Sequence, residues 1–176
     1  MKYVYEFTNK RKLTKKEFIH WFQKKFLYTI RKFQMIKSRD IVGYQNKDNF
    51  REVVLENLLK MLSEKSYIKI IKLPSRKKIT KKAIALTTDL EADKIVNIII
   101  NGKAKELNEI KAVGNKIIKP LYLFLDKEVL LYANLMGLKF KKISKKKDKI
   151  SKFIDYLEKK HPEIKHSILK SYLDLE

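Results

Sequence analysis

The sequence predicts an α/β fold, a three-layer sandwich of helices around a mostly parallel, Rossmann-like sheet. Three short apolar runs, at 41–44, 67–73 and 83–86, indicate strands. Segments with apolar residues at helical spacing, at 14–36 and 87–101 among others, alternate with them. Strands that alternate with helices favour a parallel sheet. Four glycines and three prolines in 176 residues favour regular elements with short connections.

The N-terminal part, residues 1–36, combines an arm or strand around Tyr3 with a long aromatic helix. Thr14 and Glu17 match a capping box, in which each side chain satisfies a free backbone donor at the start of the helix. Apolar residues recur every three or four positions and form a wide aromatic face: Phe18, Trp21, Phe22, Phe26, Ile30 and Phe33. The lysines around the remainder are either a solvated face or contacts for phosphate groups.

The central part, residues 37–140, is expected to hold the α/β core. Asp48 or Asn49 is placed to cap the helix that follows the first core strand. Thr87 is placed to cap a helix that ends at Gly102. The connector between that helix and Asn115 is polar, with some helical character.

The stretch 119–140 has the most regular pattern in this core. We expect Asp126 to cap a helix and Gly137 to end it in a left-handed conformation. Leu138 and Phe140, which alternate with a lysine, indicate a short strand after the helix.

The C-terminal part, residues 141–176, begins with a lysine-rich loop and continues as two helices separated by His161 and Pro162. His161 and His166 are five residues apart, so they do not share a helix face as metal ligands would. We therefore predict no metal site. The three parts together are expected to form one compact domain.

Charge is the strongest compositional signal. The chain has 42 Lys and Arg against 20 Asp and Glu, a net charge of +22. Such a field attracts polyanions, and nucleic acid is the partner that it favours. There is no cysteine, which excludes disulfides and thiolate metal ligands. No apolar run is long enough to cross a bilayer and no signal peptide is evident, so we expect a cytoplasmic protein without a membrane partner.

Two stretches carry a family resemblance. KPL, DKEV, LYA and a following glycine occur in order between Lys119 and Gly137, and LEKKHPEIKHSILKS spans the two last helices. This pattern resembles the tRNA-thiolation branch of the PP-loop ATP pyrophosphatases, which make 2-thiouridine or 2-thiocytidine. The resemblance implies a shortened PP-loop ATPase-like fold with C-terminal helices.

The nucleotide-binding loop of that family departs most from its pattern here. Relatives carry Ser-Gly-Gly-x-Asp-Ser, whose glycines let backbone N–H groups close on a phosphate. The resemblance places Asn46, Lys47, Asp48 and Asn49 in this degenerate cofactor-binding loop, without the glycine pair. It makes Asp48 the counterpart of the family's acidic residue.

A second family motif, Gly-His-Asn-Leu-Asp-Asp-Glu-Ala, aligns on Leu90. It makes Glu91 the counterpart of the first of two paired aspartates, one of which is thought to serve catalysis. Asp48 and Glu91 are thus the two catalytic candidates that the resemblance implies, although acids that favour a helix N-terminus explain Glu91 equally well. The segments with the family's cluster-binding cysteines are missing, so we expect no iron–sulfur cluster.

Three functions follow. The first is a catalytically inactive relative that binds tRNA, another structured RNA or a tRNA-thiolation partner protein. Its expected RNA contacts are Lys24, Lys25, Arg31, Lys77, Lys145, Lys146 and Lys147. The second is a residual ATP-dependent tRNA-modifying enzyme, in which Asp48 and Glu91 hold Mg²⁺ and Lys47 contacts phosphate. The third is a regulatory pseudoenzyme subunit that docks on an intact paralogue through the 18–33 aromatic face. A homodimer is a further expectation for its partner.

Overall fold

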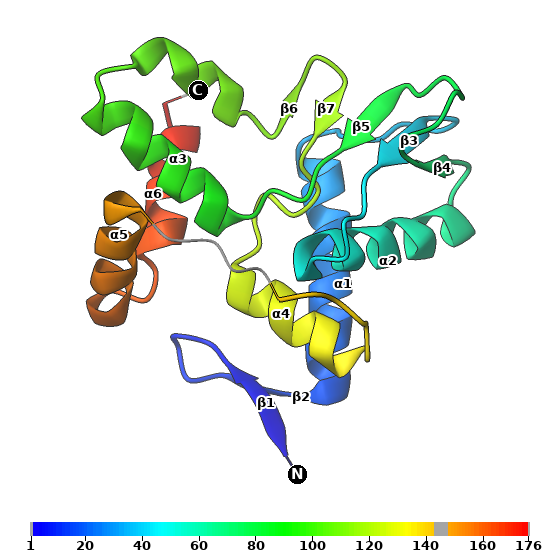
Figure 1. Ribbon diagram of the computed structural model, residues 1–176. Coiled ribbons are helices and arrows are strands. Elements are labelled where there is room, and N and C mark those ends of the chain that lie inside the picture. The colour runs from blue at the N-terminus through cyan, green and yellow to red at the C-terminus, as the bar shows by residue number, and fades with distance from the viewer. Residues whose placement is uncertain (1, 143–147, 176) are drawn as a thin grey trace.

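The computed structural model describes residues 2–142 and 148–175 and confirms the α/β fold with its mostly parallel sheet (Figure 1). Within these residues one sheet has the strand order β4-β3-β5-β7-β6, in which β6 alone is antiparallel to its neighbour. Its strands are β3 (Ile41–Tyr44), β4 (Lys69–Lys72), β5 (Lys81–Ala83), β6 (Val113–Gly114) and β7 (Ile117–Ile118).

The helices lie beside this sheet and beyond one end of it, where α3, α5 and α6 form a separate group (Figure 1). They are α1 (Lys15–Lys32), α2 (Phe50–Lys65), α3 (Thr88–Ile100), the 3-10 helix η1 (Ala104–Ile110), α4 (Asp126–Leu135), α5 (Lys149–Lys160) and α6 (Ile164–Leu173). In the described part of the chain, none of these helices has the length and apolar character needed to cross a bilayer.

The N-terminal strand pairs within its own segment. β1 (Tyr3–Glu6) and β2 (Lys12–Thr14) form an antiparallel hairpin that leads directly into α1. The capping box is confirmed, because the backbone N–H of Thr14 donates to Glu17 at 2.8 Å. Burial of the aromatic face then fixes α1 against α4, where the ring of Phe22 stacks on Tyr132 with centroids 4.2 Å apart.

A short connector crosses one face of the sheet, between β4 and β5. The side chains of Leu73 and Ile79 pack over Gly43 of β3 so closely that a Cβ at that position would lie 2.9 Å from the Ile79 side chain. Gly43 thus permits a crossover without a helix. α2 covers the other face, where the Tyr44 side chain interacts with Glu56 of that helix.

Three local expectations are wrong. Asp126 is the first residue of α4 and not its cap, since Leu125 is the N-cap and Glu128 accepts the N–H of Leu125 at 3.0 Å. The strand expected at Leu138 and Phe140 is replaced by a single bridge between Lys141 and Asn49. The third core strand, expected at 83–86, is β5 at Lys81–Ala83. The connector before Asn115 has its expected helical part as η1, and β6 near its end forms a hairpin with β7 that the sequence did not indicate.

Candidate functional site

The parallel strands place the loop after β3 and the segment before α4 at their carboxyl edge. In open α/β sheets ligands bind at this edge, because helix N-termini converge there. All four residues that the resemblance assigned to a cofactor-binding loop, Asn46 to Asn49, lie here, directly ahead of α2.

The backbone donors of this loop are bonded to the chain's own side chains. Asn49 is the N-cap of α2, and its side-chain oxygen accepts the N–H groups of Arg51 and Glu52, both at 3.1 Å. The Glu52 carboxylate accepts the N–H of Lys47 at 2.6 Å. Asn46 accepts the N–H of Asp48 at 2.8 Å. A carboxylate and two amide oxygens therefore take the N–H groups that would otherwise face an anion.

Asp48 is bound by Lys141, a residue distant in the sequence. Its backbone has φ of +62°, in the left-handed region that Asp tolerates better than most residues. Its carbonyl accepts the N–H of Lys141 at 2.6 Å, and its carboxylate lies 3.0 Å from the Lys141 ammonium. The loop is closed by these contacts, and the carboxylate has a cation of the chain beside it.

Behind the loop a polar network joins three helices. Arg51 of α2 donates two hydrogen bonds to the Asp126 carboxylate, one of them at 2.6 Å. Thr87, the N-cap residue of α3, donates its hydroxyl to the same carboxylate at 2.7 Å. The N–H of Asp126 in turn donates to Asp89 at 2.7 Å. Asp126 thus acts as an anion supplied by the protein, at the point where two helix N-termini meet.

The buried ammonium of Lys165 completes this network from α6. It lies 2.7 Å from Asp89, 3.1 Å from Asp155 and 2.7 Å from Glu158. Burial opposes its charge, but hydrogen bonds with Asp89 and Glu158 raise the pKa of Lys165 overall. Burial raises the pKa of Asp89, and the nearby Asp126 acts in the same direction.

Glu91 lies away from the loop, in a buried ion pair. Its carboxylate is 2.8 Å from the Lys119 ammonium, and the two side chains are 1% and 5% exposed. Lys119 also donates to the carbonyls of Glu109 and Ile110 at 2.8 and 2.9 Å. Burial raises the pKa of Glu91 and lowers the pKa of Lys119. The structure does not bring Glu91 together with Asp48, as shared magnesium binding would require.

The expected RNA contacts are scattered. Lys24 and Arg31 are exposed on α1, and Lys77 is exposed on the β4–β5 connector. Lys25 is turned inward, where its ammonium lies 2.7 Å from Glu128 and within 5 Å of the ring centroids of Trp21 and Phe124. The expectation that Lys25 contacts RNA phosphates is therefore wrong. Lys145, Lys146 and Lys147 lie outside the described residues.

The expectation that the 18–33 aromatic face docks on a partner protein is also wrong. Phe18, Phe22 and Phe26 are fully buried in the chain's own core, and Ile30 is 7% exposed. A partner protein has no access to these side chains in this fold.

Sequence reasoning missed Arg51, Asp126 and Lys165 as members of one network. Arg51 had a signal, since it lies two residues after a capping Asn in a segment aligned with a phosphate loop. Lys165 lay in a stretch that resembled the family, but its three acidic partners come from two other helices, which local patterns do not connect.

Comparison with known proteins supports the fold. No family model matches the chain, and no curated protein sequence matches it. Among solved structures it is similar to the U34-tRNA thiolase NcsA from Methanococcus maripaludis, determined with its 4Fe-4S cluster. The TM-score is 0.76 at 20% identity, over 98% of this chain and 84% of that one. The chain therefore shares the α/β fold of that structure, with its mostly parallel, Rossmann-like sheet. At this level of identity the likeness establishes the fold alone.

The thiolase's cluster has no matching donors here. Iron–sulfur clusters are held by cysteine thiolates, and this chain contains no cysteine. Among the described residues, no group of three or more His, Cys, Asp or Glu side chains is arranged to hold a metal ion.

Proposed function

We propose that this chain binds tRNA, or another structured RNA, and does not perform ATP-dependent sulfur transfer. The observation that carries the proposal is the closed loop after β3. The N–H of Lys47 is bonded to the Glu52 carboxylate, and two N–H groups at the start of α2 are bonded to Asn49, while the chain keeps a net charge of +22.

The closed loop argues against phosphate binding at the carboxyl edge. A triphosphate would have to displace the Glu52 carboxylate from the N–H of Lys47 and the Asn49 amide from the start of α2. Each lost hydrogen bond costs about 1 kcal/mol, and a carboxylate held near a phosphate adds repulsion. The pairing of Asp48 with Lys141 further lowers the charge available for Mg²⁺.

The positive charge argues for RNA. Cations that contact phosphates release counterions from the nucleic acid, which supplies binding energy that does not depend on the base sequence. The fold likeness to an enzyme that acts on tRNA supports RNA over other polyanions. An inactive scaffold that keeps its RNA-facing surface is consistent with both observations.

Two titrations test the proposal. We expect isothermal calorimetry with Mg-ATP to show no binding with a Kd below about 1 mM, which corresponds to a binding free energy of roughly −4 kcal/mol. We expect fluorescence anisotropy with labelled tRNA to give binding that weakens steeply with salt. Heparin serves as a polyanion control, and tRNA should compete better than heparin at equal charge. Sub-millimolar ATP binding would favour the residual tRNA-modifying enzyme, and absence of tRNA binding at low salt would overturn the proposal.

A further inference from the structure

The second edge of the sheet, which we call the amino edge, gathers the segments that precede each parallel strand. These segments are 37–40 before β3, 65–68 before β4, 77–80 before β5 and 115–116 before β7. Hydrogen bonds tie them together. Arg39 donates its N–H to the carbonyl of Tyr67 at 2.7 Å, and Thr80 donates its hydroxyl to Asp40 at 2.8 Å. The amino edge is thus one continuous surface.

Exposed cations follow this edge from strand to strand. The set consists of Lys37, Arg39, Lys65, Lys77, Lys78 and Lys116. In the described part of the chain none of the six forms an ion pair with a carboxylate. The carboxylate of Asp40 is engaged by the N–H of Lys37 and the hydroxyl of Thr80.

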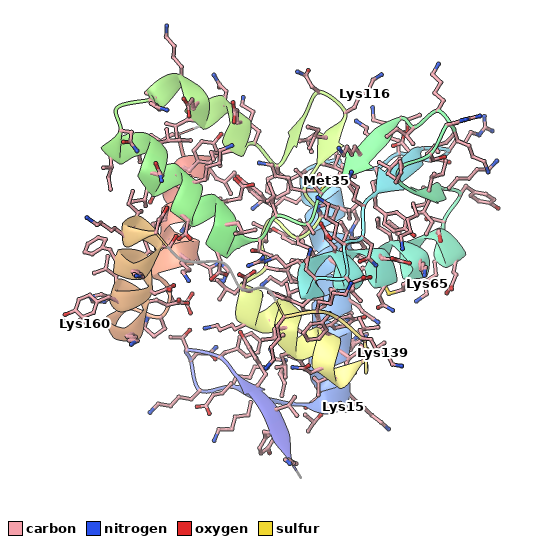
Figure 2. The ribbon with its side chains drawn as sticks, viewed as in Figure 1. Lys15, Met35, Lys65, Lys116, Lys139 and Lys160 are labelled. Atoms are coloured by element: carbon pink, nitrogen blue, oxygen red, sulfur yellow. The ribbon has the colours of Figure 1, made fainter. Side chains whose placement is uncertain are left out.

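The order of the strands spaces these cations. Neighbouring strands lie about 4.8 Å apart, so the row from β4 through β3 and β5 to β7 spans about 14 Å. Figure 2 shows its two ends, with Lys65 at the end of α2 and Lys116 at the tip of the β6–β7 hairpin. A row of separated charges fits the backbone of a nucleic acid strand.

Tyr67 adds a feature that charge alone does not provide. Its side chain is 88% exposed, the most exposed of the large hydrophobic side chains in the described residues. Its carbonyl accepts the backbone N–H of Arg39, so the ring projects from a backbone that is tied to the segment before β3. Proteins that recognise unpaired bases stack them on such rings and place cations on the flanking phosphates.

We propose that RNA binds along the amino edge, with its backbone on the row of cations and one unpaired base stacked on Tyr67. The inference rests on the proposed RNA-binding function and locates it. It places the RNA at the edge opposite the closed loop after β3. A bilayer with anionic lipids is the competing partner for a basic surface, but a single ring on a fixed backbone suits a base better than it suits membrane insertion.

Two sets of variants test the proposal by anisotropy with labelled tRNA and with a single-stranded RNA 12-mer. The edge variant replaces Lys37, Arg39, Lys78 and Lys116 with Ala. The control variant replaces four exposed lysines elsewhere with Ala, namely Lys16, Lys139, Lys152 and Lys159. Both remove four charges. We expect the edge variant to flatten the slope of log affinity against log salt by about 3 and the control to change it by less than about 1.

Tyr67→Ala should weaken binding of the 12-mer about five- to a hundred-fold without changing the salt slope, and Tyr67→Phe should bind like the parent chain. If the parent chain binds RNA but the edge and control variants lose the same amount of RNA affinity, the proposed location at the amino edge is wrong and the RNA-binding function stands. If Tyr67→Ala binds normally, the stacking is wrong. If the parent binds phosphatidylserine vesicles but not RNA, both the location and the proposed function are overturned.

Discussion

The buried Glu91–Lys119 pair gives a sharp test of whether Glu91 is structural. The perturbation is Lys119→Met, which removes the ammonium 2.8 Å from the Glu91 carboxylate and keeps a side chain of similar length. At an effective dielectric constant of 20, the attraction lost is about 6 kcal/mol. The measured loss should be smaller, because the isolated carboxyl can take up a proton.

That proton sets both the size and the pH dependence of the effect. Glu91 has an ordinary pKa of 4.5, so holding it protonated at pH 7 costs about 3.4 kcal/mol. The carbonyls of Glu109 and Ile110 also lose their donor, which adds roughly 1 kcal/mol. We expect a loss of about 4–5 kcal/mol at pH 7, in the range found for broken buried ion pairs.

In this variant the folded state binds one proton more than the unfolded state at every pH above the ordinary pKa of Glu91. Stability should therefore fall by about 1.4 kcal/mol per pH unit relative to the parent chain, and the loss at pH 5 should be about 2.7 kcal/mol smaller than at pH 7. Urea unfolding at both pH values measures this. The double variant Glu91→Leu/Lys119→Met is the control and should show no such slope. An equal loss at both pH values would refute the reasoning.

Three further predictions concern the site and its supports. Asn49→Ala should cost about 1 kcal/mol through loss of the N-cap of α2, and Asn49→Asp should keep most of it, as measured by urea unfolding. Lys165→Met should cost about 3–5 kcal/mol because it leaves Asp89, Asp155 and Glu158 without their shared cation, and a thermal shift below about 5 °C would contradict this. Burial, with Lys25 nearby, lowers the pKa of His166 against the opposing charges of Glu128, Glu163 and Asp89. The unfolded state therefore binds the His166 proton first as pH falls below about 6.5, so the parent chain should lose stability there, and His166→Asn should show a flatter profile from pH 7.5 to 5.5.

Local signals in the sequence were sufficient for much of the fold. The capping box at Thr14, the cap at Asn49 and the first two core strands depend on neighbouring residues and on spacing, and each was found. The third core strand was found two residues earlier than expected, at Lys81–Ala83. The β6–β7 hairpin was missed because two-residue strands carry almost no periodic pattern, and Val113 and Ile117 are separated by a short polar turn.

The candidate site was harder to predict because its contacts join distant segments. The family motif pointed to Glu91 as a catalytic acid, but only the fold shows that Lys119, 28 positions later, lies against it. The same applies to Lys25, whose helical pattern placed it on a basic side, whereas Glu128 draws its ammonium inward. Whether a charged side chain is buried or exposed thus depends on an ionic partner that is distant in the sequence.

The bridge between Asn49 and Lys141 helps to hold the loop after β3 closed. Two segments more than ninety residues apart now lie strand-to-strand where the loop would need to open, and the rings of Phe50 and Phe140 meet beside them, centroids 6.2 Å apart. Glycine substitutions after Tyr44 would loosen only the first of these segments, since the second would still hold the loop closed. Opening this loop toward a ligand would therefore require changes in both segments at once, because a change in one segment leaves the contacts of the other in place.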